Sequence, residues 1–166
     1  TDVSSNLCLL PGTQSYSCEH ITADNMADLI EKLDDEYDIV LLDCPPGIGD
    51  MIELCAEVSD EAIMVINADY AALRDADALE DRLLRCGVWR RNYILNGLAL
   101  DLVEKGAVVD IEEIDARLRC AMLGAIMYDF NIKASTNQGV PITIKRDTYI
   151  AQNYDRIASR LLAEEY

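Results

Sequence analysis

Several residue types that build catalytic and metal sites are scarce in this sequence. It contains one histidine, His20, and its six cysteines include no C-x-x-C pair. A zinc site needs several such ligands at close spacing, so no zinc site is expected. The sequence has neither a G-x-S-x-G nor a G-x-G-x-x-G motif, which argues against a Ser-His-Asp hydrolase and a dinucleotide-dependent enzyme. Scattered, unpaired cysteines are typical of a reducing compartment.

Basic residues are also few. Aspartate and glutamate number 31 and lysine and arginine 14, which gives a formal charge of -17. Such a field repels phosphate backbones and anionic membrane surfaces, so autonomous binding to nucleic acid or to a membrane is not expected. No charged and apolar leader is present, and no apolar run is long enough to cross a bilayer. These features predict a soluble, cytoplasmic protein.

Short apolar runs alternate with amphipathic stretches along the chain. The runs predict strands at 6–11, 38–43, 61–68, 92–98 and 122–128. Helical spacing predicts helices at 23–33, 51–58, 73–87, 110–118 and 148–165. Thr22 or Asp24, and also Asp110, are candidate N-caps, and Gly87 is a candidate C′ residue. The alternation predicts a single α/β domain over residues 1–166, with a doubly wound, mostly parallel sheet and helices on both faces.

The stretch YDIVLLDCPPGIGD, residues 37–50, carries an acid from an apolar run into a turn. In doubly wound sheets ligands bind beyond the carboxyl ends of the strands, where Asp43 is expected. Nucleotide hydrolases use such an aspartate to hold the water shell of Mg²⁺, and a following glycine such as Gly47 lets a backbone N–H approach the terminal phosphate. Asp, Pro and Gly also end strands for reasons of turn chemistry, so the motif alone leaves both interpretations open. Cys44 is interpreted as a small packed residue, not as a reactive thiolate.

The same stretch resembles the Walker B and switch region of the MinD/ParA family of deviant Walker ATPases, whose pattern is approximately Y-D-x-h-h-h-D-x-P-x-G. Three further stretches resemble this family, and its bacterial MinD branch most of all, in the same order: SDEAIMVINADYAALRDADAL (59–79), YILNGL (93–98) and ASTNQGVPI (134–142). The sequence NLCLLPGTQ is similar to the strand and loop ahead of the Walker B region. The resemblance implies a P-loop NTPase-like fold that is incomplete at its N-terminus.

The resemblance implies ligand contacts for three residues at strand ends. Asp43 would lie near Mg²⁺ and contact it through water, and Gly47 would lie beside the γ-phosphate of ATP. Asn96 would hydrogen-bond the adenine; the alternative interpretation is a turn residue before Gly97.

Residues 129–141, including Asp129 and Pro141, would complete the base pocket. Here the sequence departs from the family, because IMYD stands where an I-P-E-D type of sequence is usual. Met127 therefore replaces the expected proline, which leaves nucleotide affinity and base preference open.

Arg74 and Asp75 match an R-D segment that, in the family, faces the dimer interface and regulatory partners. The alternative interpretation is the start of an exposed, salt-bridged helix, where charged pairs contribute little to stability. The sequence leaves these two interpretations open.

One motif of the family is missing. No G-x-x-x-x-G-K-[ST] loop and no G-K dipeptide occur in the chain. That loop supplies the phosphate-binding N–H groups, a lysine and a Mg²⁺-binding hydroxyl, so this chain alone is expected to be catalytically inactive. In the family the loop comes first, which suggests that the chain is the C-terminal portion of a longer protein.

The missing loop has a consequence for the sheet. In the family the strand before the loop neighbours the stretch at 38–43, so an unpaired apolar edge is expected there. We predict that another copy or a separate N-terminal piece covers this edge. At the other terminus, the acidic ending RLLAEEY stands where the family has a basic, membrane-binding helix. Either that tail was removed or this relative does not use the membrane.

The resemblance therefore predicts part of an ATP-binding and ATP-hydrolysing molecular switch. It would form a homodimer with ATP and Mg²⁺, recruit a regulatory or division-site protein, and position the division septum or another cargo. The parent protein would be cytoplasmic or peripheral at the inner membrane. The alternative is a degenerate, non-hydrolysing interaction module, which Met127 and the missing loop favour.

Overall fold

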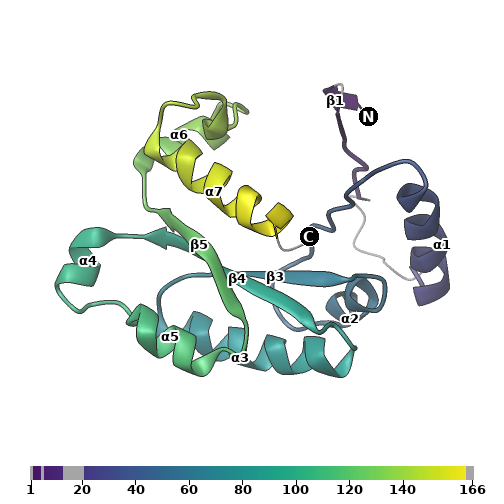
Figure 1. Cartoon of the computed structure of the whole chain (residues 1–166), viewed down its shortest axis with the longest axis horizontal. Coiled ribbons are helices and arrows are strands. Elements are labelled where there is room, and N and C mark those ends of the chain that lie inside the picture. The colour runs from purple at the N-terminus through teal and green to yellow at the C-terminus, as the bar shows by residue number, and fades with distance from the viewer. Residues whose placement is uncertain (1, 5, 13–20, 164–166) are drawn as a thin grey trace. The chain divides into compact units, whose positions relative to one another are not determined.

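The computed structural model describes residues 2–4, 6–12 and 21–163 (Figure 1). They fall into two compact units, 1–40 and 41–166, and each is described by itself. That the two units form one domain stays a prediction. His20 and the end of the predicted C-terminal helix, 164–165, lie outside the described residues.

The first unit contains one predicted helix. Helix α1 (Ala23–Asp34) begins after Thr22, whose side-chain oxygen accepts a hydrogen bond from the Asn25 N–H at 3.2 Å. This contact satisfies one of the N–H groups that a helix start leaves without an internal partner. The helix is therefore confirmed, and Thr22, not Asp24, is its N-cap.

The prediction of a buried strand at 6–11 is wrong. Only β2 (Leu7–Cys8) forms there, and it pairs antiparallel with β1 (Asp2–Ser4). Residues 6–12 are exposed, and the side chain of Leu10 is 66% exposed. β2 pairs only with a short antiparallel neighbour, so its apolar side chains are not enclosed as they are in a covered parallel sheet.

The predicted strand at 38–43 does not form either. The backbone of residues 39–45 belongs to no helix or strand, and Leu41 is 78% exposed. A strand exists only where a neighbour takes up its backbone hydrogen bonds, and no described strand pairs with this stretch. Because the strand does not form, the structure does not test the unpaired strand edge that was expected here. That another copy or an upstream piece covers it stays a prediction.

The second unit is built on a parallel sheet. Its strands are β3 (Glu61–Ile66), β4 (Arg90–Leu98) and β5 (Ala121–Met127), in the order β3-β4-β5. All pairs are parallel, so the connections must cross from one end of the sheet to the other. The three strands confirm the predicted ones, with ends that differ by one or two residues.

Helices precede, connect and follow these strands. They are α2 (Asp50–Glu57), α3 (Tyr70–Arg85), α4 (Leu100–Glu104), α5 (Ile111–Arg117), α6 (Phe130–Asn137), the 3₁₀ helix η1 (Ile142–Ile144) and α7 (Tyr149–Ala163). Asp110 caps α5 by accepting a hydrogen bond from the Glu112 N–H at 3.0 Å, as predicted, and Gly87 follows the C-cap of α3. α4, α6 and η1 bury none of their residues, so no apolar pattern predicted them. Among the described residues, no helix is both long and apolar enough to cross a membrane.

Helices cover both faces of the sheet (Figure 1). On one face α2, α3 and α5 enclose the larger core, in which Tyr93 and Leu95 of β4 and Ile114 of α5 are fully buried. On the other face α7 packs Ile157 against Leu123 and Ile126 of β5. The doubly wound α/β architecture follows from strands that are apolar on both sides.

Gly124 lets α7 approach the sheet. A Cβ atom at this position would lie 2.7 Å from Cγ1 of Ile157 and 3.3 Å from its Cδ1. The strand register shifts here, between the pairs Tyr93–Met122 and Ile94–Gly124, so Leu123 and Gly124 both face α7. A side chain at 124 would push the helix away.

A buried charge cluster ties α3 to the rest of the sheet layer. Glu80 is fully buried and accepts hydrogen bonds from the Arg119 N–H at 3.0 Å and from Arg91 Nη2 at 3.4 Å. Burial, together with the neighbouring Glu80 charge, raises the pKa of the Cys120 thiol to about 12. The sequence did not predict this cluster, because Glu80 lies among the apolar positions of an amphipathic helix.

Candidate functional site

The carboxyl ends of the three parallel strands meet at one edge of the sheet, from which α4 and α6 continue (Figure 1). A cavity of about 460 Å³ lies at this edge. It is lined by Asn67, Ala68, Asp69, Gly97, Leu98, Ala99, Leu102, Ala107, Val108 and Tyr128. Its walls are joined by two backbone hydrogen bonds, from the Val109 N–H to the Ala68 carbonyl at 3.1 Å and from the Tyr128 N–H to the Leu98 carbonyl at 2.9 Å. Ligands of doubly wound sheets bind at this edge.

Asp43 is exposed and begins the segment that leads to α2. The next side chain, Cys44, is half-buried and packs against the larger core. Burial, a hydrogen bond with the Cys55 thiol and the nearby Asp43 charge raise the pKa of Cys44 to about 11. A thiol with such a pKa stays protonated at neutral pH, so Cys44 is the packed residue that was predicted. It anchors the chain directly after the exposed carboxylate.

Gly47 has a φ of 102°, a backbone conformation that residues with a side chain rarely adopt. A Cβ atom at Gly47 would have no other atom within 4 Å, so the backbone conformation, not crowding, favours glycine here. Two residues later Gly49 is the N-cap of α2. The segment after Asp43 thus offers an exposed backbone that a ligand can approach closely.

Asn96 lies within β4 and is exposed. The register between β4 and β5 is irregular around it, because Leu95 pairs with Ala125 and Leu98 with Met127. The side-chain amide of Asn96 can both donate and accept hydrogen bonds, as a base contact requires. Asn96 is therefore a strand residue at a bulge, at the edge where the cavity lies.

The other predicted base-pocket residues lie around the end of β5. Met127 is half-buried and packs against the larger core. Asp129 is the N-cap of α6, and its Oδ1 accepts from the Asn131 N–H at 2.7 Å. Its Oδ2 accepts from the Tyr149 hydroxyl at 2.5 Å, which lowers the pKa of Asp129. Pro141 is exposed and precedes η1.

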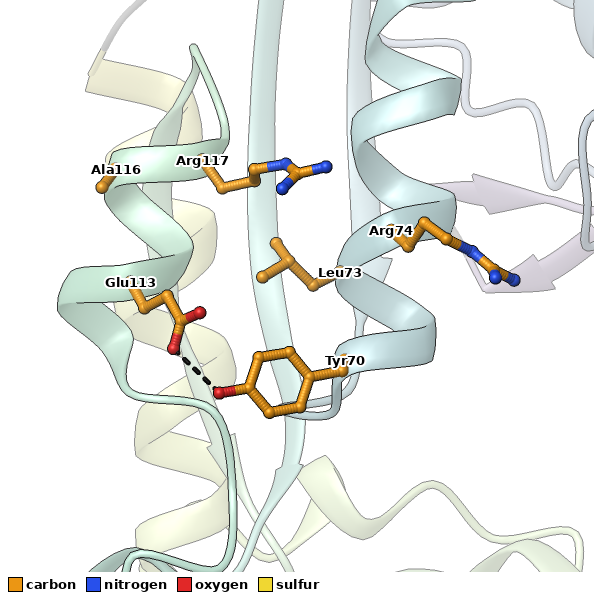
Figure 2. Close-up of a pocket in the computed structure, with 6 residues that line it drawn as sticks. All are labelled: Tyr70, Leu73, Arg74, Glu113, Ala116 and Arg117. Atoms are coloured by element: carbon orange, nitrogen blue, oxygen red, sulfur yellow. Dashed lines mark hydrogen bonds between the residues drawn. The ribbon is translucent and has the colours of Figure 1, made fainter.

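Arg74 and Asp75 lie on the exposed side of α3. Arg74 Nη2 is 3.3 Å from Asp75 Oδ1, and both side chains are largely exposed. Arg74 also lines a second cavity of about 370 Å³ between α3 and α5, in which the Tyr70 hydroxyl donates to Glu113 at 3.1 Å (Figure 2). That hydrogen bond raises the pKa of Tyr70. The ion pair is the one expected of a salt-bridged helix start, and a partner could still reach it.

The described residues hold no group of three or more His, Cys, Asp or Glu side chains that could bind a metal ion. Mg²⁺ bound with a nucleotide needs no such group, because it keeps several waters and takes other ligands from phosphate oxygens. A single exposed carboxylate such as Asp43 is compatible with that mode of binding.

Relatives of this chain are septum site-determining proteins. Residues 4–85 match a family model described as an AAA domain. MinD of Synechocystis sp. is 30% identical over 161 residues, which are 96% of this chain and 60% of that protein. MinD of Helicobacter pylori is 32% identical over 167 residues, covering 96% of this chain and 62% of that protein. The chain thus spans about 60% of the length of the curated relatives it matches.

Solved structures of MinD proteins are also similar to this chain. The MinD cell division protein of Aquifex aeolicus superposes with a TM-score of 0.82 at 26% identity, over 86% of this chain and 61% of that chain. The MinC:MinD cell division protein complex of the same organism gives the same TM-score and identity, over 86% of this chain and 59% of that chain. The septum site-determining protein MinD of Pyrococcus horikoshii, complexed with Mg-ADP, has a TM-score of 0.72 over 89% of this chain and 60% of that chain. At 22% identity this match shows a similar fold only.

The parallel sheet covered by helices on both faces, together with these structural likenesses, defines an α/β protein of the P-loop NTPase fold. Fold alone does not assign function. The likeness to MinD sequences, however, extends over nearly the whole chain. In sequence and in fold the chain is therefore similar to the MinD/ParA family of deviant Walker ATPases, the family that its motifs resemble.

Proposed function

We propose that this chain is part of an ATP-dependent molecular switch of the MinD/ParA type that acts in positioning the division septum. The observation that carries the proposal is Asp43, an exposed carboxylate that leads through Gly47 into α2 in a chain similar to this family. The curated relatives, which are septum site-determining proteins, support the division role.

Asp43 would hold Mg²⁺ through water, and Gly47 would present its backbone N–H to the γ-phosphate. When bound, Mg·ATP supplies the phosphoryl group and the cation that neutralises its charge. Asp43 would orient the water shell of the cation, and the packed side chain of Cys44 would keep that carboxylate in place. The Mg-ADP in the Pyrococcus structure supports this choice of ligand.

The base would contact the ends of β4 and β5. Asn96 offers an exposed amide that can hydrogen-bond a purine edge. Met127 and Pro141 would supply apolar contacts beside it. Asp129 would border the base, although both of its carboxylate oxygens already accept hydrogen bonds from Asn131 and Tyr149.

Besides the N–H of Gly47, the phosphates need the lysine and the row of N–H donors that a phosphate-binding loop supplies. The G-x-x-x-x-G-K-[ST] loop is absent from these 166 residues, and the formal charge is -17. We therefore propose that the phosphate-binding loop belongs to another part of the whole protein and that the chain alone does not hydrolyse ATP. ATP would join two whole copies, and hydrolysis would separate them.

A division protein would bind on the face of α3 that carries Arg74 and Asp75. These side chains are largely exposed and paired with each other, so a partner could compete for either charge without opening the core. The complex of MinC with MinD in the Aquifex structure supports a partner of this kind. We propose that the protein acts in the cytoplasm and at the inner face of the membrane.

A second candidate function is a degenerate interaction module that no longer turns over nucleotide. It is favoured by Met127, which replaces the family's usual proline, and by the engaged carboxylate of Asp129. Such a protein would bind its partner whether or not ATP is present.

Substitution of Asp43 by Asn in the whole protein tests the leading proposal. Outer-shell residues of metal sites typically change metal affinity by about 10–100-fold, so the Mg²⁺-dependent part of ATP affinity should fall by about that factor. Asp50→Asn, the same charge change at the first residue of α2, is the matched control and should change this affinity little. Equal effects of the two substitutions would contradict the assignment of Asp43.

A further inference from the structure

The segment after β5 lies between two anchored elements. β5 is held in the sheet, and α7 packs on that sheet through Ile157 and is fixed at its start by Ile150, which is 1% exposed. In addition, Arg160 of α7 donates to the Leu123 carbonyl of β5 at 2.6 Å. Between these elements, α6 and η1 bury none of their residues fully; Ile132 near the start of α6 packs partly against the core of β5 and α7, and η1 at the other end contacts α7. The position of the segment at 130–144 therefore depends mainly on contacts near its two ends.

One hydrogen bond joins the two ends. The hydroxyl of Tyr149, the first residue of α7, donates to Asp129 Oδ2 at 2.5 Å. The Oδ1 atom of Asp129 accepts from the Asn131 N–H at 2.7 Å and from its side-chain amide at 2.8 Å. Hydrogen bonds to an ionised carboxylate are stronger than those between neutral groups. Asp129 thus fixes the start of α6 and at the same time ties it to α7.

The protonation states of Tyr149 and Asp129 favour the hydrogen bond between them. The Tyr149 hydroxyl lowers the pKa of Asp129, with a further contribution from the Asn131 N–H. In return, Asp129 raises the pKa of Tyr149. Near neutral pH the carboxylate is therefore ionised and the hydroxyl protonated, as this hydrogen bond requires.

We propose that Tyr149 is a positioning residue for nucleotide binding, and that Asp129 anchors the base-binding segment instead of contacting the base. The inference rests on the proposed function, in which Pro141 and the end of β5 border the adenine. Because both oxygens of Asp129 are engaged, it has little capacity left for the base. What it provides is a fixed start for α6 and for the turn that leads to Pro141.

The test compares Tyr149→Phe with the wild-type whole protein, and Tyr154→Phe, in the same helix, is the matched control. If the released segment is in its binding position about one fifth of the time, the affinity for Mg·ATP falls about fivefold. The affinity for Mg·tripolyphosphate, which has no base or ribose, should stay unchanged. The N–H groups of α6, that of Asn131 above all, should exchange with deuterium faster in Tyr149→Phe only.

The outcomes separate the two proposals. If the wild type binds Mg·ATP and Tyr149→Phe binds it equally well, the positioning role is wrong and the proposed function stands. If ATP and tripolyphosphate affinities fall together, the substitution acts through a general disruption, which also overturns the positioning role. If the wild type binds no ATP, the proposed function fails, and unchanged exchange in α6 would then overturn the anchoring as well.

Discussion

Replacement of Glu80 by alanine should strongly destabilise the protein. Glu80 is fully buried and the side chain of Arg91 is 7% exposed. Arg91 Nη2 lies 3.4 Å from Glu80, and its Nη1 donates to the carbonyls of Val88 and Trp89 at 3.0 and 2.7 Å. Alanine at position 80 would remove the charge partner and leave the guanidinium enclosed. It would also remove the acceptor of the Arg119 N–H.

The expected loss follows from the burial of the pair. Removing one partner of a buried ion pair typically costs about 3–5 kcal/mol. Folded domains are stable by about 5–15 kcal/mol, so the change removes a large fraction of the total. At about 2–4 °C per kcal/mol, Tm should fall by roughly 6–20 °C. The double substitution Glu80→Met with Arg91→Met should cost less than the sum of the single ones, because it leaves no buried charge unpaired.

Denaturant unfolding, followed by far-UV circular dichroism and by fluorescence, measures this loss. The fluorescence comes from Trp89, the only tryptophan in the sequence, whose carbonyl accepts from Arg91. The control is Asp75→Ala on the same helix, whose side chain is 67% exposed and should be nearly neutral. Point substitutions destabilise proteins by about 1 kcal/mol on average. A smaller loss for Glu80→Ala would show that the buried pair with Arg91 does not stabilise the fold.

Three further predictions concern close packing, backbone conformation and pH. Gly124→Ala should cost about 1–3 kcal/mol, because its Cβ would clash with Ile157, and a double-mutant cycle with Ile157→Ala should show a coupling that offsets part of the loss. Gly47→Ala should weaken Mg·ATP binding by the whole protein, because alanine is strained by about 1 kcal/mol at a positive φ. Calorimetry measures this affinity, and an unchanged value would exclude a role for the Gly47 backbone. The folded-state pKa values of Cys44 and Cys120, about 11 and about 12, lie above the ordinary 9.0, so the unfolded chain loses these protons first. The contribution of these two thiols to the free energy of unfolding is complete below about pH 9, and it should be lost as pH rises through their folded-state pKa values. Cys120→Ala should lessen this loss, as measured by urea titrations at several pH values.

The sequence predicted those elements whose packing partners lie within the chain. β3, β4 and β5 pair with one another and are covered by helices, so their apolar runs became strands. The runs at 6–11 and 38–43 are also mainly apolar, yet only Leu7–Cys8 of the first forms a strand, and residues 39–45 belong to no helix or strand. An apolar run specifies a buried strand only when a neighbouring strand is available.

The candidate site was predictable to a similar extent. Asp43 and Asn96 were expected at strand ends, from the apolar runs and the family motifs. No strand forms before Asp43, and Asn96 lies within β4, two residues before its end. The bond between Tyr149 and Asp129 joins residues 20 positions apart, and neither residue lies in a pattern that predicts the other. Glu80 and Arg119 are 39 positions apart, and no sequence pattern predicts their hydrogen bond either. Such side-chain pairs are fixed by tertiary packing, which local sequence does not determine.

The central claim is that this chain supplies part of a Mg·ATP site. Titration calorimetry with Mg·ATP and Mg·ADP, on the whole protein and on the 166-residue chain alone, tests it most directly. The whole protein should bind both nucleotides, and the chain alone should bind them far more weakly, because we place the phosphate-binding loop outside it. If the whole protein binds neither nucleotide, the proposed Mg·ATP site is wrong and Asp43 is left without a ligand.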